Sequence, residues 1–185
     1  MLILKKQNLI TMTRRFSLFL IATYLFFACG QKNVPTLKNS ALLSSFIAQS
    51  GIKAVQATDD SLLIKAKRWQ GSGNYPGVDA WEVFEIPAQT KLYGGLPGQS
   101  EFYSIEKSLT DVNYDKVKYW ASLQVSPHPQ FGFRPKVGEY TVNNTIKVAV
   151  SLTLANPNHG AGGAWQVFVS DYTKKLTFVK EIPLK

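Results

Sequence analysis

The feature that most limits the fold is a stretch of ten residues, 145–154, in which apolar and polar or small side chains alternate strictly. Alternation with a period of two is typical of a strand that buries one face. A strand of this kind needs neighbours to pair with and a layer that covers its apolar face, so the stretch predicts a sheet-based domain with its core here. The apolar positions are Ile146, Val148, Val150, Leu152 and Leu154.

Other segments predict further strands because β-branched or aromatic residues are followed by Gly, Pro or turn residues. These segments are 62–67, 81–86, 91–93, 165–169 and 176–182. In 62–67 the residues Leu62, Ile64 and Ala66 alternate with Leu63, Lys65 and Lys67. Six to eight strands are therefore expected.

Two segments predict helices. In SALLSSFIAQSG, apolar residues form one helical stripe, Ser40 can cap the start and Gly51 can end it. Residues 113–124 form the second helix, with Asn113 as the cap and one face made of Tyr114, Val117, Trp120 and Ala121. The expected fold class is α+β: a single, mostly antiparallel β domain with one or two helices.

The N-terminal part predicts export. Residues 16–28 are an apolar run of 13 that follows Arg14 and Arg15. A membrane-spanning helix needs about 20 residues, so the run suits the core of a signal peptide. It ends at Ala28, and Cys29, the only cysteine of the chain, follows directly.

This junction resembles the lipobox of bacterial lipoproteins, which implies cleavage before Cys29 and a lipid on its sulfur. Residues 1–28 are then a signal peptide of the lipoprotein type, 29–40 a tether and 41–185 the α+β domain. The membrane becomes a partner through the lipidated cysteine, and the location is the bacterial cell envelope, outside the cytoplasm. An ordinary secretory leader is the alternative.

The composition excludes several kinds of disulfide and metal site and bears on the charge of a partner. One cysteine excludes an internal disulfide framework and a multi-cysteine metal site, and two histidines exclude a three-histidine site. The net charge is +9, and without the leader 17 basic and 12 acidic residues remain, a net charge of +5. This excess suits an anionic partner such as nucleic acid, a nucleotide phosphate or an anionic membrane surface. Only Arg68 and Arg134 are arginines after the leader, fewer than phosphate-tracking proteins usually have, which makes nucleic acid the less favoured partner.

Motifs for several enzyme classes are absent from the sequence: GxSxG, HExxH, the Walker loop and GxGxxG do not occur. His128 lies between two prolines and His159 lies in an Asn/Gly loop, which is typical of loop residues. They are also the general acid and base that a nuclease would need.

Two glycine-rich stretches, 91–104 and 156–169, are candidates for a ligand site. Glycines let a ligand approach the backbone closely, and aromatic rings stack on planar groups. Each stretch joins a polar residue to an aromatic neighbour, Ser104 to Tyr103 and Gln166 to Trp165. We expect Ser104 and Gln166 to face one cleft from neighbouring strands.

The blocks LYGGLPGQSEFYS, YWASLQVSPHPQFGFRP, VGEYTV and GAGGAWQVFV follow one another between residues 81 and 185. This succession resembles C-terminal toxin domains of bacterial polymorphic toxins, of the Rhs and contact-dependent-inhibition kind. The resemblance implies a split sheet similar to that of ADP-ribosyltransferases. It also implies NAD as a substrate, with no cofactor, and an immunity protein as a partner.

The resemblance assigns roles residue by residue. It implies that Ser104 belongs to the second-strand Ser/Thr motif, with Tyr103 stacking on nicotinamide. Gln166 stands at the late Glu/Gln position that orients the ribose, and both are the catalytic candidates. In Tyr93-Gly94-Gly95, glycine stands where the family has an arginine.

The phosphate contact then falls to Arg134 or Lys91, and the NAD-binding candidates are Tyr103, Trp165 and Arg134. Three functions stay open: an effector domain that acts on NAD by glycohydrolysis or ADP-ribosyl transfer, a basic RNase-like toxin domain, and a non-enzymatic, surface-anchored binding lipoprotein. Loss of NAD, loss of RNA, or neither would separate them.

Overall fold

The central strand β6 (Ile146–Leu152) lies inside an eight-stranded antiparallel sheet, as the alternating stretch predicts. The computed structural model describes residues 40–70, 79–156 and 159–185. The predicted leader, Cys29 and nearly all of the tether lie outside the described residues. In the described part, five helices accompany the sheet, so the α+β, mostly antiparallel class is confirmed.

The strand order is β1-β2-β6-β7-β4-β3-β5-β8, and every pairing is antiparallel. The other strands are β1 (Val55–Gln56), β2 (Glu82–Ile86), β3 (Lys91–Gly94), β4 (Phe102–Ser104), β5 (Lys136–Val142), β7 (Trp165–Phe168) and β8 (Leu176–Pro183). All predicted strands except 62–67 are therefore present, with ends shifted by one or two residues.

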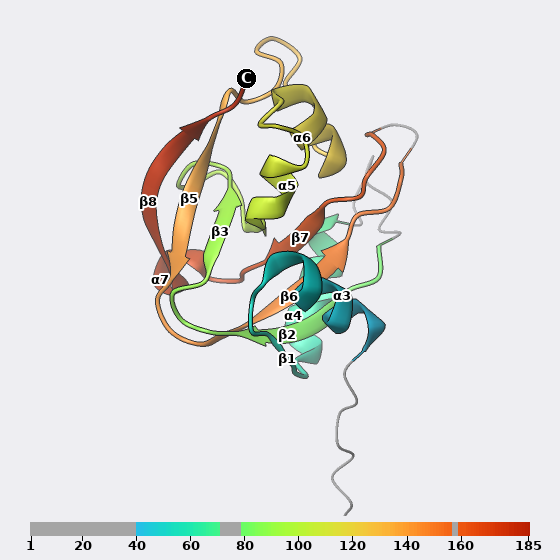
Figure 1. Cartoon of the computed structure of the whole chain (residues 1–185), viewed down its shortest axis with the longest axis vertical. Helices are drawn as coiled ribbons and strands as arrows, with labels where there is room; N and C mark the ends of the chain where they lie inside the picture. Colours follow the sequence, from blue (N-terminus) through green and yellow to red (C-terminus); the bar gives the residue numbers. More distant parts are fainter. Residues whose placement is uncertain (1–39, 71–78, 157–158) are drawn as a thin grey trace, which may run out of the picture. The chain divides into compact units, whose positions relative to one another are not determined.

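A short junction joins two halves of the sheet. Strands β4 and β7 share only the pairs Phe102↔Phe168 and Tyr103↔Val167, whereas β2 and β6 share five. In Figure 1 the strands β3, β5 and β8 run steeply, whereas β2 and β6 run at a shallow slope. The strand direction thus changes across β4, which shares only two residue pairs with β7 and two with β3.

The largest apolar core lies on the face of β6 that the alternation predicts. Val148 and Val150 are fully buried there, and α3 (Ala41–Ser50) covers this face through Leu43 and Phe46. The opposite face of β6 is also buried, because Ala149 packs with Leu62 and Ala66 in a separate apolar cluster. The strand therefore has two buried faces over much of its length, which a pattern with one apolar face does not predict.

Helix α3 is confirmed at both ends. The Ser40 hydroxyl accepts a hydrogen bond from the Leu43 backbone N–H at 2.9 Å. Gly51 adopts the left-handed conformation, with φ of 69°, and its N–H donates to the Ile47 carbonyl at 2.9 Å. Both groups satisfy backbone atoms that a helix end leaves unpaired.

Segment 62–67 is helical, so the predicted strand is wrong. Helix α4 (Asp60–Gln70) begins after Asp59, whose carboxylate accepts from the Leu62 N–H at 3.0 Å. Leu62 and Ala66 are four residues apart and share the buried face. Three alternating apolar residues fit the period of a strand as well as that of a helix. The Asp59 cap and the i, i+4 pair together favour the helix.

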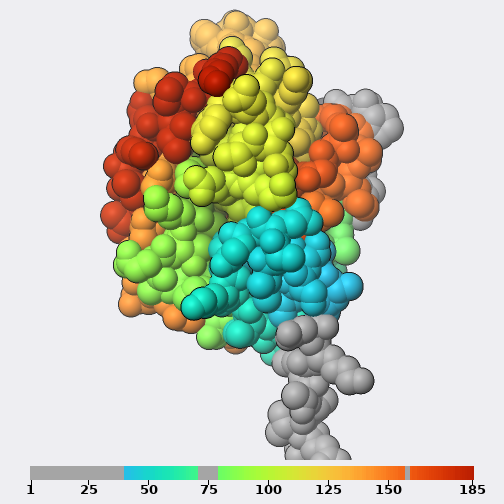
Figure 2. All heavy atoms as spheres, in the orientation of Figure 1, coloured from blue at the N-terminus to red at the C-terminus, as the bar shows by residue number. Residues whose placement is uncertain are grey.

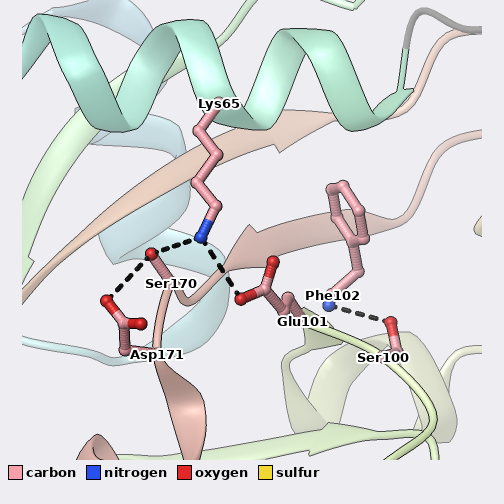
Figure 3. A network of polar contacts seen from close by, with 6 residues as sticks. All are labelled: Lys65, Ser100, Glu101, Phe102, Ser170 and Asp171. Atoms are coloured by element: carbon pink, nitrogen blue, oxygen red, sulfur yellow. Dashed lines mark hydrogen bonds and ion pairs between the residues drawn. The ribbon is translucent and has the colours of Figure 1, made fainter.

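Lys65 attaches α4 to the sheet. Its ammonium donates to Ser170 Oγ at 2.8 Å and lies 3.5 Å from Glu101 Oε1, as Figure 3 shows. The Lys65 nitrogen also lies 5.8 Å from the centre of the Phe168 ring. The helix therefore contacts residues beside both β4 and β7, the two strands of the junction.

The predicted helix 113–124 is shorter than expected. α6 (Lys116–Ser122) follows α5 (Glu106–Thr110), and Asp115, not Asn113, caps it. Asn113 has φ of 51°, which a first-turn residue cannot have. The buried residues of α6 are Tyr119 and Trp120, and Val117 is exposed. The buried face is therefore rotated by part of a helical turn from the predicted one.

Strand β8 ends the sheet, after the short helix α7 (Tyr172–Lys175). In Figure 2 the red C-terminal residues lie beside the yellow α5–α6 region. Backbone hydrogen bonds link Lys185 to Tyr114 and Lys116 at 2.8 and 3.0 Å. Among the described residues, no helix is long and apolar enough to span a bilayer.

Candidate functional site

Gln166 and Ser104 stand on opposite sides of the sheet junction. The β4–β7 ladder ends at Tyr103↔Val167, one position before these two residues. Each then pairs outward in its own half, Ser104 with Tyr93 and Gln166 with Ser151. The two side chains therefore flank the point where the two halves of the sheet separate.

Helix α6 packs over this point. The Tyr119 hydroxyl lies 2.8 Å from Ser104 Oγ, and Gln166 Nε2 donates to the Leu123 carbonyl at 2.9 Å. Tyr119 and Leu123 are one helical turn apart, so one helix contacts both strands. Burial raises the pKa of Tyr119 above its ordinary value, which keeps the phenol neutral beside the serine.

A cavity of about 220 Å³ opens beside Gln166. Its lining combines side-chain amides, one guanidinium and two aromatic rings, and a smaller recess of about 50 Å³ extends it toward β3. The described residues lining the larger cavity are Trp69, Gln70, Gln99, Ser100, Phe102, Leu123, Gln124, Val125, Arg134 and Gln166.

Ser104 does not face this cavity, so the prediction that Ser104 and Gln166 face one cleft is wrong for Ser104. Both lie under α6, but Ser104 is fully buried and lines neither space. Its hydroxyl is 3.2 Å from the Tyr93 carbonyl and 2.8 Å from the Tyr119 hydroxyl. These contacts connect β3, β4 and α6, so Ser104 is a structural link here.

The aromatic neighbours also differ from the expectation. Trp165 points to the opposite face of β7, where its indole N–H donates to Gln49 Oε1 at 3.1 Å and its ring packs on Phe46. Successive residues of a strand face opposite sides, so Trp165 cannot accompany Gln166 into the cavity. The ring of Tyr103 packs on Tyr140 in the same core and touches only the small recess.

Gly94 has no room for the arginine expected there, and Arg134 lies beside its neighbour Gly95. A Cβ on Gly94 would lie 2.8 Å from Tyr103 Cδ1 and 2.9 Å from the Phe102 carbonyl, so no side chain fits there. The Arg134 guanidinium lies over Gly95, with Nη1 3.1 Å from where a Cβ would be, and 5.7 Å from the Trp120 ring centre.

Lys91 is less suited to a phosphate contact. It forms an ion pair with Glu139 at 3.0 Å, and this pairing raises the pKa of the lysine. Lys91 lines neither space beside Gln166, whereas Arg134 lines both. Of the two alternatives, the geometry favours Arg134.

Among the polar residues of the cavity, sequence reasoning missed Gln70 and Gln124. Gln70 ends α4 and donates to Gln166 Oε1 at 3.3 Å. Gln124 follows α6 with φ of 59°, and its buried Nε2 has no hydrogen-bond partner among the described residues. Single glutamines carry no motif, so neither had a signal in the sequence.

The two histidines lie in loops, as predicted, and neither lines the cavity. His128 Nδ1 accepts from the backbone N–H groups of Gln130 and Phe131 at 3.2 and 3.3 Å. His159 Nδ1 is 2.8 Å from Ser126 Oγ. Among the described residues, no group of three or more His, Cys, Asp or Glu side chains is placed to hold a metal ion.

Comparison with known proteins was made on sequence and on structure. The family model described as the Rhs1 C-terminal toxin domain matches residues 58–171. The structure is similar to Rhs1-CT in complex with its cognate immunity protein RhsI1, with a TM-score of 0.62 and 32% identity. The likeness covers 69% of this chain and 98% of that one.

A second structure, Tse6 in complex with Tsi6, matches at 14% identity and a TM-score of 0.36, over 65% of this chain and 93% of that one. No curated protein sequence matches the chain. The family match covers more than half of the residues and includes α4, the sheet junction and the cavity beside Gln166. This chain belongs to the Rhs1 C-terminal toxin domain family.

Proposed function

We propose that this toxin domain acts on NAD, breaking the bond between nicotinamide and ribose at the Gln166 cavity. The observation that carries the proposal is the placement of the Gln166 amide, held at the junction of the sheet in a cavity that Arg134 also lines. We further infer that the β4–β7 junction is the equivalent of the split in an ADP-ribosyltransferase-like sheet.

The cavity matches parts of the dinucleotide. Its volume of about 220 Å³ lies below the range of roughly 300–1,000 Å³ usual for drug-sized ligands. It would therefore take the nicotinamide-ribose end, next to the Phe102 ring. The diphosphate would lie toward the exposed Arg134, whose guanidinium can bind two phosphate oxygens at once.

Bond cleavage in this proposal needs no ionised protein group. The C–N bond breaks, its electron pair leaves with nicotinamide, and positive charge develops on the ribose. The Gln166 amide hydrogen-bonds a ribose hydroxyl and strengthens that contact as the charge grows. In glycohydrolysis, water then adds to the ribose carbon and releases one proton, giving ADP-ribose; in transfer, an acceptor nucleophile takes the place of water.

The test measures NAD consumption by the purified protein and by Gln166→Ala. Loss of a contact made in the transition state typically costs on the order of 10²–10³ in rate, so we expect a fall of this size. Melting temperature monitors folding, and Gln130→Ala, in an exposed loop, is the matched control. A folded wild type without NAD turnover, or equal turnover by Gln166→Ala, would refute the proposal.

We propose that Cys29 carries the lipid that anchors the domain at the bacterial cell envelope. The support is the apolar run, Ala28 and the single cysteine in series. Two or more acyl chains would hold the protein firmly at a membrane. Cys29→Ser should block lipidation and leader cleavage, and a Cys29→Ser protein processed and fractionated like the wild type would contradict this.

We propose that the domain binds an immunity protein. The support is that Rhs1-CT, which shares 32% identity with this chain, has been solved in complex with its cognate immunity protein. The toxin domain mixed with RhsI1, the immunity protein solved with Rhs1-CT, should elute as one complex on size-exclusion chromatography. Separate elution of the two proteins would argue against that partner.

A further inference from the structure

We propose that Gln70 is a positioning residue that holds the Gln166 amide in one orientation, and that this orientation requires glutamine at position 166. The inference rests on the proposed function of Gln166. It starts from a chain of hydrogen bonds that runs from Trp81 through Gln70 and Gln166 to the Leu123 carbonyl.

The first end of the chain determines how the Gln70 amide points. The Trp81 indole N–H, which can only donate, is 2.7 Å from Gln70 Oε1. The Asp79 carboxylate accepts a hydrogen bond from Gln70 Nε2. With a donor on its oxygen and an acceptor on its nitrogen, the Gln70 amide has one favourable orientation, and its Nε2 also faces Gln166.

The far end determines the orientation of Gln166 in the same way. Its Oε1 lies 3.3 Å from Gln70 Nε2, and its Nε2 lies 2.9 Å from the Leu123 carbonyl, which can only accept. Turning the amide over would place nitrogen against nitrogen and oxygen against oxygen. Two hydrogen bonds would become two repulsions in a site where Gln166 is 8% exposed.

The residues that orient Gln70 are themselves fixed in place by further contacts. Asp79 is 6% exposed, and its second oxygen accepts from the Leu154 backbone N–H at 2.7 Å. The Trp81 ring packs on Phe102 with 6.0 Å between ring centres. Gln70 is the last residue of α4, the helix that Lys65 ties to the sheet (Figure 3).

This arrangement of donors and acceptors suits glutamine at position 166 but not glutamate. A glutamate at 166 would still accept from Gln70, but its second oxygen would face the Leu123 carbonyl with no proton between them. The contacts with Gln70 and Leu123 use one hydrogen and one lone pair of the Gln166 amide. One further N–H and one further lone pair are then available to a ligand hydroxyl, in directions that Gln70 sets.

The test combines spectroscopy with kinetics on Gln70→Met, Gln166→Glu and the control Gln130→Met. The side-chain amide signals of Gln166 are assigned by ¹⁵N NMR from their loss in Gln166→Ala. In Gln70→Met we expect hydrogen exchange of this amide to be about tenfold faster, because Gln166 Oε1 loses the donor that orients it. We also expect a lower melting temperature, because the Trp81 indole N–H and the Asp79 carboxylate lose their partner as well. The control should leave the signals unchanged.

The kinetic expectation is that kcat for NAD falls roughly 10- to 100-fold in Gln70→Met, with KM little changed, because misorientation affects the transition state more than binding. Gln166→Glu should lose activity to the extent that Gln166→Ala does. If Gln70→Met fails to fold, Trp81→Phe removes the orienting donor and keeps an aromatic ring. Its amide signals and kcat should then change in the same direction.

The outcomes separate the two proposals. A folded wild type without NAD turnover defeats the proposed function, and the NMR result alone then decides whether Gln70 orients Gln166. Unchanged Gln166 amide exchange in Gln70→Met, or full activity in Gln166→Glu, would overturn the positioning role even if NAD is consumed.

Discussion

Val150→Asp tests the core that the alternating strand predicts. Val150 lies in the middle of β6 and is fully buried, with 0% of its surface exposed. It belongs to the largest apolar cluster. Its neighbours across the sheet are Glu82 and Val167. A carboxylate at this position would have no cationic partner in that cluster.

The magnitude follows from two contributions. Removing a buried Val side chain costs about 1.5–3 kcal/mol. An aspartate in such a place remains neutral because burial raises its pKa, by up to roughly 3–5 units from about 3.9. Holding it neutral at pH 7 costs about 4 kcal/mol, at roughly 1.36 kcal/mol per unit. The sum, about 6 kcal/mol, is comparable to the whole stability of many domains.

The assay is urea denaturation of Val150→Asp, Val150→Asn and Leu154→Asp. Leu154 has the same place in the alternation but is 49% exposed, so its substitution should cost under about 1 kcal/mol. The penalty of Val150→Asp should shrink as pH falls toward 4, because the unfolded carboxyl then also takes up a proton, whereas that of Val150→Asn should stay constant. Equal costs at 150 and 154, or a cooperative Val150→Asp transition at the wild-type urea concentration, would refute the reasoning.

Three further outcomes are expected. Gly94→Ala should lower the free energy of unfolding by about 1–3 kcal/mol, since its Cβ would lie 2.9 Å from the Phe102 carbonyl. A melting curve like that of the wild type would show that the backbones of β3 and β4 leave room for a Cβ there. Burial raises the pKa of Tyr140 to about 12 and raises that of Tyr119 further. The free energy of unfolding should therefore fall as pH rises above about 10, where the tyrosines of the unfolded chain ionise. Denaturation midpoints between pH 8 and 11 check this, and a midpoint that does not change with pH would contradict it. Gln124→Gly should raise the melting temperature by about 2–4 °C, because glycine removes the strain of φ at 59°, and a lower melting temperature would show that the buried amide stabilises the fold.

Patterns within a few residues predicted much of the fold. The period-two stretch predicted β6 and the face that it buries, and Ser40 with Gly51 predicted both ends of α3. These features are local: a strand alternates because of backbone geometry, and a cap satisfies backbone groups within three or four residues. The blocks between residues 81 and 185 also indicated the toxin family that the comparisons show.

Local pattern failed where two structures fit the same residues. Segment 62–67 alternates as a strand and also places Leu62 and Ala66 one helical turn apart, and packing of α4 on the sheet decides between them. Likewise, the pattern joined Trp165 to Gln166 as neighbours, yet β7 sends their side chains to opposite faces.

The candidate site itself depends on tertiary structure. The residue Gln166 was predicted from the sequence, but its partner Gln70 is 96 residues away and its other contact, Leu123, is 43 residues away. Arg134 reaches the space above Gly95 only because the order of β5, β3 and β4 brings its loop there. Periodicity and capping act within a few residues of the chain, whereas the orientation of a buried amide is set by donors and acceptors that only the folded sheet and its helices bring together.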